Sequence, residues 1–210
     1  MSYDYSENIL VQESAGHLLA DELGWDVCFA YNTEVLGADG TFGRESYKDI
    51  LLIRYFREAL KKFNPWIQDS QISEAQKILE NRLSTSSLLQ VNEEKYYLIR
   101  DGIPVTIKKP NGQTEIKKAM VIDFQNPENN YFLAIKELKI HGDLYRRRTD
   151  IVGFVNGIPL LFVELKKNTV DVQSAYDDYQ DTIPHLFYYN AFLMLSNGTE
   201  AKIGTLGSKF

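Results

Sequence analysis

Two apolar runs that turn at Asn156-Gly157 constrain the fold of this chain more than any other segment. The stretch from residue 150 to residue 166 reads DIVGFVNGIPLLFVELK, and runs of this kind are typical of strands that are covered on both faces. Side chains along a strand alternate between its two faces, so Glu164 and Lys166 share one face while Leu165 points to the other. The sequence therefore predicts a buried hairpin with ionisable groups at its open end.

The ionisable groups at the open end are costly to bury. A carboxylate or an ammonium loses its hydration in an apolar site, so such groups are normally paired with one another or bound to a metal ion. Asp150 and Glu164 offer the hard oxygen ligands that a divalent cation prefers, and Lys166 can orient a water or offset negative charge. This donor set suits the hydrolysis of phosphodiester bonds, and a hairpin with ordinary charged ends is the alternative.

The turn determines whether the two carboxylates can share a metal ion. A strict two-residue turn at Asn156-Gly157 pairs Val155 with Ile158. Because side chains alternate along each strand, Asp150 and Glu164 would then lie on opposite faces of the hairpin. No shared metal site forms with that register.

Two departures from the strict turn bring the carboxylates together. A three-residue loop with a left-handed glycine pairs Phe154 with Ile158 and makes Glu164 a diagonal neighbour of Asp150, roughly 7 Å away. A β-bulge further along the hairpin is the other solution, and Pro159, which lacks an amide donor, can help to set the register there. A shared site thus requires the three-residue loop or a bulge.

The motifs in and next to the hairpin are residues 146–150, 154–160 and 163–166. Further motifs lie elsewhere in the chain. In combination they resemble the nuclease domain of the R subunit of type I restriction-modification enzymes, from about residue 7 to the end of the chain. The additional stretches that carry this resemblance are Phe63-Asn64-Pro65, residues 102–107, Val121 to Phe124, Asn130-Tyr131-Phe132, residues 183–187 and residues 196–200.

The resemblance implies an α/β fold with a PD-(D/E)XK (restriction-endonuclease-like) core, in which helices flank a mixed central sheet. It also implies that Asp150 and Glu164 bind Mg²⁺ and that Lys166 is the catalytic lysine. In many nucleases of this fold a glutamate of the first helix adds to the metal site. Glu13 is the candidate here, and Glu7 is the competing residue.

Two positions depart from the family pattern. Thr149 stands where the motif has proline, a change we expect to be tolerated because only the following aspartate has a chemical role. The family often carries glutamine-x-x-x-tyrosine on the next helix, whereas here Gln173 is followed by Tyr176 and then by Tyr179. Residues three apart share a helix face, so Gln173 and Tyr176 can fill this role as DNA contacts, or can be an ordinary solvated glutamine and a half-buried tyrosine.

Charge and composition set limits on the function. The chain has 210 residues, is 44% hydrophobic and carries a net charge of −6, so bulk electrostatics does not mark it as a nucleic-acid binder. Basic residues are nevertheless clustered in its second half, where such runs are usually solvated faces. The runs are Lys108-Lys109, Lys117-Lys118, Arg146-Arg147-Arg148 and Lys166-Lys167. Because of their place beside the predicted site, we expect Arg146, Arg147, Arg148 and Lys167 to bind DNA.

The periodicity of the chain predicts one domain with a helical insertion at about residues 44–100. Helices are expected at 7–23, at 45–63, from Ser70 or Ser73 to 83, at 86–100 and at about 172–180. Strands are expected at 25–31, 105–108, 117–124, 131–140, in the 150–165 hairpin and at 191–195. A lone Cys28 and the lack of a signal peptide or of a ~20-residue apolar span indicate a cytoplasmic protein without a membrane partner.

These features together predict a Mg²⁺-dependent endonuclease domain that cuts double-stranded DNA. No G-x-x-x-x-G-K-[ST] phosphate loop is present, so we expect an N-terminal fragment without the ATP-driven motor of full-length R subunits. Family resemblance implies the methyltransferase and specificity subunits as partners. The alternatives are a stand-alone nuclease for branched or damaged DNA, similar to junction resolvases or Mrr-like enzymes, and a non-catalytic DNA-binding or docking module of the same fold.

Overall fold

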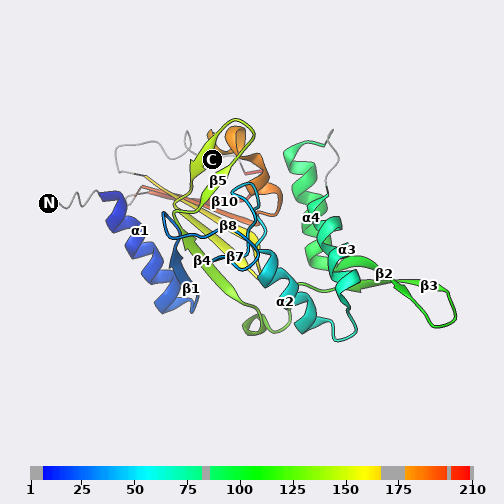
Figure 1. Cartoon of the computed structure of the whole chain (residues 1–210). Helices are drawn as coiled ribbons and strands as arrows, with labels where there is room; N and C mark the ends of the chain where they lie inside the picture. The colour runs from blue at the N-terminus through cyan, green and yellow to red at the C-terminus, as the bar shows by residue number, and fades with distance from the viewer. Residues whose placement is uncertain (1–6, 82–85, 167–177, 198–199, 209–210) are drawn as a thin grey trace.

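A mixed six-stranded sheet forms the centre of the molecule in a computed structural model that describes residues 7–81, 86–166, 178–197 and 200–208. The strand order is β1-β4-β7-β8-β9-β10 (Figure 1). β1 is parallel to β4 and β8 is parallel to β9, whereas the other neighbours are antiparallel. The strands are β1 (Asp26–Phe29), β4 (Phe132–Lys136), β7 (Ile151–Val155), β8 (Ile158–Leu165), β9 (Phe192–Ser196) and β10 (Ala201–Gly204).

Helices cover both faces of this sheet, which confirms the predicted α/β fold class. On one face, α1 (Glu7–His17) and the π-helical turn Leu18–Glu22 pack against Ile151, Val163 and Leu165. On the other face, Val152 and Phe162 belong to a larger core that is shared with three helices. These are α2 (Ile53–Phe63), α3 (Asp69–Glu80) and α4 (Leu88–Asp101), which lie in sequence between β1 and β4.

The helix predicted at residues 45–63 begins only at Ile53, so its first eight residues were assigned wrongly. Leu51 and Leu52 are buried without being helical, and the Leu52 amide donates to the carbonyl of Gly157 at 2.9 Å. Buried residues of a non-helical segment can have the same apolar spacing as an amphipathic helix, and the sequence alone does not distinguish the two. The next two helices agree with the prediction in place, and Ser87 caps α4 by accepting from the Gln90 amide at 3.3 Å.

Two small antiparallel pairs lie outside the main sheet. β2 (Ile103–Lys108) pairs with β3 (Thr114–Ala119), and β5 (Lys139–His141) pairs with β6 (Arg146–Arg148). The strand predicted at 131–140 is broken at Glu137, whose φ of 57° is left-handed, and the one predicted at 117–124 ends at Ala119. The expected strand at 191–195 is present as β9. Residues 178–182 are helical, and the rest of the helix predicted at 172–180 lies outside the described residues.

A buried ion pair organises the irregular segment between β1 and α2. The Arg44 guanidinium donates to both carboxylate oxygens of Glu34, at 2.8 and 2.6 Å, and the two side chains are 0% and 4% exposed. It also donates to the carbonyls of Asp49 and Lys139, at 2.9 and 3.0 Å. One arginine therefore ties this segment to itself and to β5.

Within the described ranges, no helix has the length and apolar character needed to cross a lipid bilayer.

Arg44→Ala is expected to lower the free energy of unfolding by about 3–5 kcal/mol, because it leaves the Glu34 carboxylate buried without its partner. Arg57→Ala is the matched control, since Arg57 is paired with Asp69 at 3.4 Å on the surface and should cost no more than about 1 kcal/mol. Urea unfolding of both variants measures the difference. Equal losses would contradict the role assigned to Arg44.

Candidate active site

The hairpin of β7 and β8 turns through two residues, not three. Val155 pairs with Ile158, and Asn156 and Gly157 both have positive φ, of 51° and 81°, as a type I′ turn requires. The three-residue loop, with Phe154 opposite Ile158, was one of the two solutions open from the sequence, and the hairpin does not have it. A Cβ on Gly157 would lie 2.4 Å from the carbonyl oxygen of Leu52, so glycine is required here for close packing as well as for its φ.

A β-bulge in β8 supplies the register shift that the turn does not. Phe154 pairs with Pro159 but Gly153 pairs with Leu161, which leaves Leu160 as the extra residue. The Leu160 carbonyl accepts from the Ala191 amide at 2.8 Å. The bulge was the second of the two solutions open from the sequence, and it falls directly after the proline that cannot donate to the ladder.

After the bulge, Ile151 pairs with Val163, so the next step of the register aligns Asp150 with Glu164. Side chains of directly opposed residues lie on the same face. Leu165 is 3% exposed and packs in the core on the α1 side, whereas Lys166 Nζ lies 2.5 Å from Glu164 Oε1. The two carboxylates and the ammonium thus gather at one end of the sheet.

Asp150 is held by two hydrogen bonds. Its Oδ2 accepts from the Leu165 amide at 2.7 Å, and its Oδ1 accepts from Gln12 Nε2 of α1 at 2.9 Å. Gln12 is 7% exposed, so this contact is shielded from water. The sequence pointed to the first helix for a residue of the site, but not to Gln12, because no spacing rule fixes which face of a helix meets a distant strand.

Glu164 is the most unusual ionisable group of the site. It is 1% exposed, its Oε1 is ion-paired with Lys166, and its other polar neighbour is the Tyr179 hydroxyl, which donates to the Arg148 carbonyl. Burial, and then the negative charge of Asp150, raise the pKa of Glu164 to about 8, although Lys166 opposes the shift. A buried carboxylate whose lone pairs are not all taken up by the chain offers the oxygen donors that a divalent cation binds.

Tyr179 lies beside both carboxylates. Its hydroxyl donates to the Arg148 carbonyl at 2.9 Å, and its ring packs edge-on against Phe162. Burial, followed by the charges of Glu164 and Asp150, raises the pKa of Tyr179 well above its usual value. The hydroxyl therefore stays protonated. Among the described residues Tyr179 is the tyrosine at the site, whereas Gln173 and Tyr176 lie outside the described residues.

The donors present fit a small, hard divalent cation. Mg²⁺ is commonly held by one or two carboxylates and keeps several of its waters, so Asp150 and the unsatisfied oxygens of Glu164 are a sufficient protein contribution. Within the described ranges, no three His, Cys, Asp or Glu side chains gather as a metal-binding group. Glu13, the expected third ligand, pairs instead with Lys136 at 2.7 Å.

The predicted basic cluster is divided by its partners. Arg147 pairs with Asp178 at 2.6 Å, and Arg148 pairs with Glu137 at 3.1 Å and lies over the ring of Tyr31. Arg146 is exposed on β6. Lys167 lies outside the described residues. Arg147 and Arg148, which were expected to bind DNA, are therefore each paired with a carboxylate.

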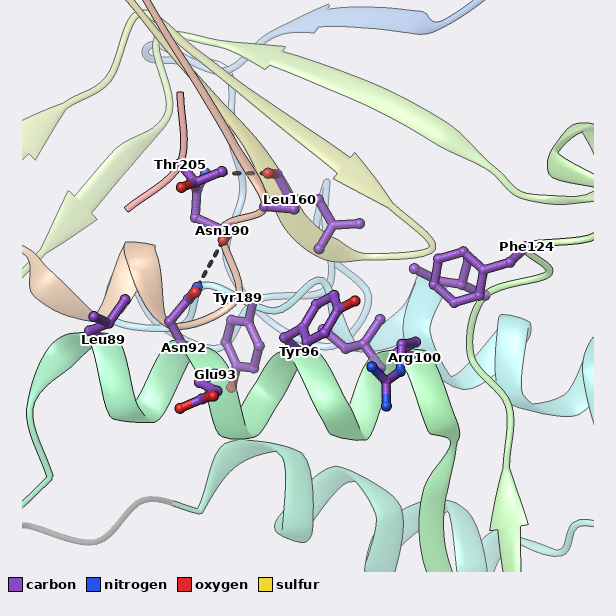
Figure 2. A pocket seen from close by; sticks show the side chains of 13 residues that line it. Leu89, Asn92, Glu93, Tyr96, Arg100, Phe124, Leu160, Tyr189, Asn190 and Thr205 are labelled. Carbon is purple, nitrogen blue, oxygen red and sulfur yellow. Dashed lines mark hydrogen bonds between the residues drawn. The ribbon is translucent and has the colours of Figure 1, made fainter. Parts of the chain in front are cut away.

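A pocket of about 650 Å³ lies away from these groups, between α4 and the ends of β8 and β9 (Figure 2). Its walls are mostly apolar, with Tyr96, Tyr189 and Leu160 among them. The side-chain amides in its wall are hydrogen-bonded to backbone carbonyls. Asn92 donates to the Asn190 carbonyl at 2.8 Å, and Asn190 donates to the Leu160 carbonyl at 3.3 Å (Figure 2). Because neither Asp150 nor Glu164 lines this pocket, it is separate from the carboxylate site.

The family of this chain is shown by its similarity to known proteins. Residues 4–210, nearly the whole chain, match the family described as "Type I restriction enzyme R protein N terminus". The chain belongs to this family. The resemblance inferred from the hairpin and its accompanying motifs is thereby confirmed.

Relatives of this R-protein N-terminal domain are much longer than the chain. It is 32% identical over 195 residues to the type I restriction enzyme HindI endonuclease subunit of Haemophilus influenzae, a match that covers 90% of this chain and 18% of that protein. It is 29% identical over 170 residues to a Methanocaldococcus jannaschii protein, by its name an MjaIXP type I restriction endonuclease subunit, covering 77% and 16%. The chain thus spans less than a fifth of these relatives.

The metal-free R-protein domain should lose stability as pH rises from about 4.5 through about 8. The folded state holds the Glu164 proton more tightly than the unfolded chain does, so this contribution is complete below the unfolded pKa and is lost as the folded group ionises. Glu164→Gln removes the titration and should leave the thermal midpoint unchanged or higher at the upper end of this range. Melting curves in EDTA measure it, and a parental midpoint that does not fall relative to the variant's contradicts the assignment.

Proposed function

We propose that this chain is the Mg²⁺-dependent endonuclease domain of a type I restriction enzyme R subunit and hydrolyses phosphodiester bonds of double-stranded DNA. The observation that carries the proposal is Glu164, a buried carboxylate with unused oxygens, aligned with Asp150 and paired with Lys166. Leaving two like charges together in an apolar site costs stability, and a bound divalent cation offsets that cost. The names of the relatives, which are endonuclease subunits, support the same function.

Each residue of the site has a distinct task in this proposal. Asp150 and Glu164 hold the cation, and hydrogen bonds from Gln12 and the Leu165 amide fix the orientation of the Asp150 carboxylate. Bound Mg²⁺ supplies positive charge that lowers the pKa of a water and neutralises phosphate oxygens. Lys166 is close enough to Glu164 to orient that water or to stabilise the charge that develops on the phosphoryl group.

Full-length R subunits provide the remaining activities in the proposal. Because the relatives are more than five times as long as the match, ATP hydrolysis and translocation are expected from segments outside the matched region. The methyltransferase and specificity subunits are the expected partners, and the bacterial or archaeal cytoplasm is the expected compartment.

Burial raises the pKa of the Cys28 thiol to about 11, which suits an unreactive structural cysteine.

Plasmid nicking tests this function. Glu164→Gln removes a charge that the cation needs, and Lys166→Ala removes the ammonium, so each should lower the Mg²⁺-dependent rate by about a hundredfold or more. The matched controls are Asp69→Asn and Lys61→Ala, because Asp69 and Lys61 form an exposed pair, at 3.3 Å, on α3 and α2 and outside the carboxylate site.

Three outcomes of this assay distinguish the alternatives. A Lys166→Ala chain that nicks at the parental rate contradicts the catalytic assignment. Cleavage of branched junctions but not of plasmid favours a stand-alone nuclease for unusual DNA structures. Metal-independent DNA binding without any cleavage favours a docking module of the same fold.

Two adjacent residues of α1 allow a separate test of the metal site. Gln12→Ala deletes the hydrogen bond to Asp150, so the Mg²⁺ concentration for half-maximal nicking should rise about tenfold, in the range found for residues that orient metal ligands. Glu13→Gln should leave it unchanged, because Glu13 pairs with Lys136 and not with Asp150. The rise in thermal midpoint on adding Mg²⁺ is the second readout. The reverse order of effects would restore Glu13 as the ligand.

A further inference from the structure

The β2–β3 ribbon is set apart from the rest of the fold. It is a two-stranded sheet of its own and projects beyond α3 and α4, at the end of the molecule opposite α1 (Figure 1). Every residue from Lys108 to Lys118 is exposed, and Ile116 is 74% exposed. An exposed ribbon of this kind buries little surface, so its sequence is free to serve binding.

The charge of the ribbon is opposite to that of the whole chain. Residues 103–119 contain four lysines and a single carboxylate, Glu115, whereas the net charge of the chain is −6. Glu115 is neutralised by Lys109, with Nζ 2.9 Å from the carboxylate. The ribbon is therefore a local positive feature on an acidic protein.

The strand register divides the lysines between two faces. Pro104 pairs with Lys118, Thr106 with Ile116 and Lys108 with Thr114, so these six residues share one face, which carries two lysines and no carboxylate. Glu115 pairs with Ile107 and belongs to the opposite face, together with Lys117. The face of Lys108 and Lys118 thus carries one lysine near each end, and the carboxylate that meets it between them is Glu74 of α3, through Thr106.

The base of the ribbon is firmly attached. Glu74 of α3 accepts from the Thr106 amide at 3.0 Å and from its hydroxyl at 2.9 Å, and Gln71 donates to the Thr106 carbonyl at 3.1 Å. On the opposite face, Lys117 Nζ lies 4.3 Å from the centre of the Trp66 ring. These contacts fix the direction of the ribbon, so its lysines are presented without a large ordering cost on binding.

We propose that the β2–β3 ribbon is a DNA-binding arm that places Lys108 and Lys118 against the phosphates of a duplex. The choice of duplex DNA rests on the proposed nuclease function and on charge complementarity. A two-stranded ribbon is narrow enough to enter the major groove, and lysine–phosphate contacts hold a protein on DNA without reading its sequence. The arm contacts the duplex away from Asp150 and Glu164, so its binding to DNA does not require the metal ion.

Lysines on an exposed strand have a competing explanation, since they also prevent edge-to-edge aggregation. The two explanations differ in what they predict for DNA. Lys108→Gln/Lys118→Gln removes two charges and keeps the apolar stems, and Lys48→Gln/Lys61→Gln is the matched control on exposed lysines elsewhere. Binding of a short labelled duplex in EDTA, followed by fluorescence anisotropy over a salt series, measures contacts without cleavage.

The ribbon variant is expected to raise Kd about tenfold and to lower the slope of log Kd against log salt by about two, one for each lost phosphate contact. The control variant should bind as the parental chain does, and Lys108→Arg/Lys118→Arg should restore binding. An unchanged Kd and slope overturn the inference, as does a parental chain that does not bind duplex at low salt. An equal loss for single strands overturns the groove contact.

The plasmid assay keeps this inference separate from the proposed function. Parental nicking together with unaltered duplex binding by the ribbon variant means that the nuclease function stands and the arm does not. Loss of duplex binding in the ribbon variant, in a chain that never nicks plasmid, means that the arm stands and the nuclease function does not.

Discussion

A single extra residue in β8 is the constraint on which the site depends. The two-residue turn at Asn156-Gly157 alone would send Asp150 and Glu164 to opposite faces, and the bulge at Leu160 brings them back into line. Proline at position 159 removes an amide from the ladder at that point, and the next strand takes up the displaced carbonyl. The bulge is therefore built into the sheet on both sides, and the geometry of the carboxylates is inherited from it.

The period-two pattern of the hairpin was sufficient to predict which residues share a face. It placed Leu165 in the core and Lys166 beside Glu164, as the structure has them. It could not choose between turn types, because the left-handed conformation of Asn156 is stabilised by distant groups. The Asn156 side chain accepts from the Tyr131 amide and donates to the Val121 carbonyl, each at 2.8 Å. Contacts between residues so far apart in sequence leave no local signal.

Elsewhere the sequence did not predict which side chains are buried, because their burial does not follow from helical or strand periodicity. Nothing in the sequence marks Arg44 as buried, yet its side chain is fully buried and makes four hydrogen bonds. The choice between Gln12 and Glu13 depends on how α1 is rotated against the sheet, which is set by the packing of residues such as Leu19 with β7 and β8. A one-residue difference along a helix turns the side chain by about 100°, and only tertiary packing decides which of the two reaches Asp150.

Thr149 gives the sheet end a requirement that the motif's name conceals. Its amide and its hydroxyl both donate to the Leu138 carbonyl, at 3.1 and 3.2 Å, and the side chain is fully buried. Proline, the residue of the motif, can make neither bond. A protein engineer who replaced Thr149 by the consensus residue would thus detach the strand entry from Leu138 one position before Asp150. In this chain the threonine is a structural adaptation. Replacing it by the proline of the motif would remove both hydrogen bonds to Leu138 and so weaken the attachment of this strand end.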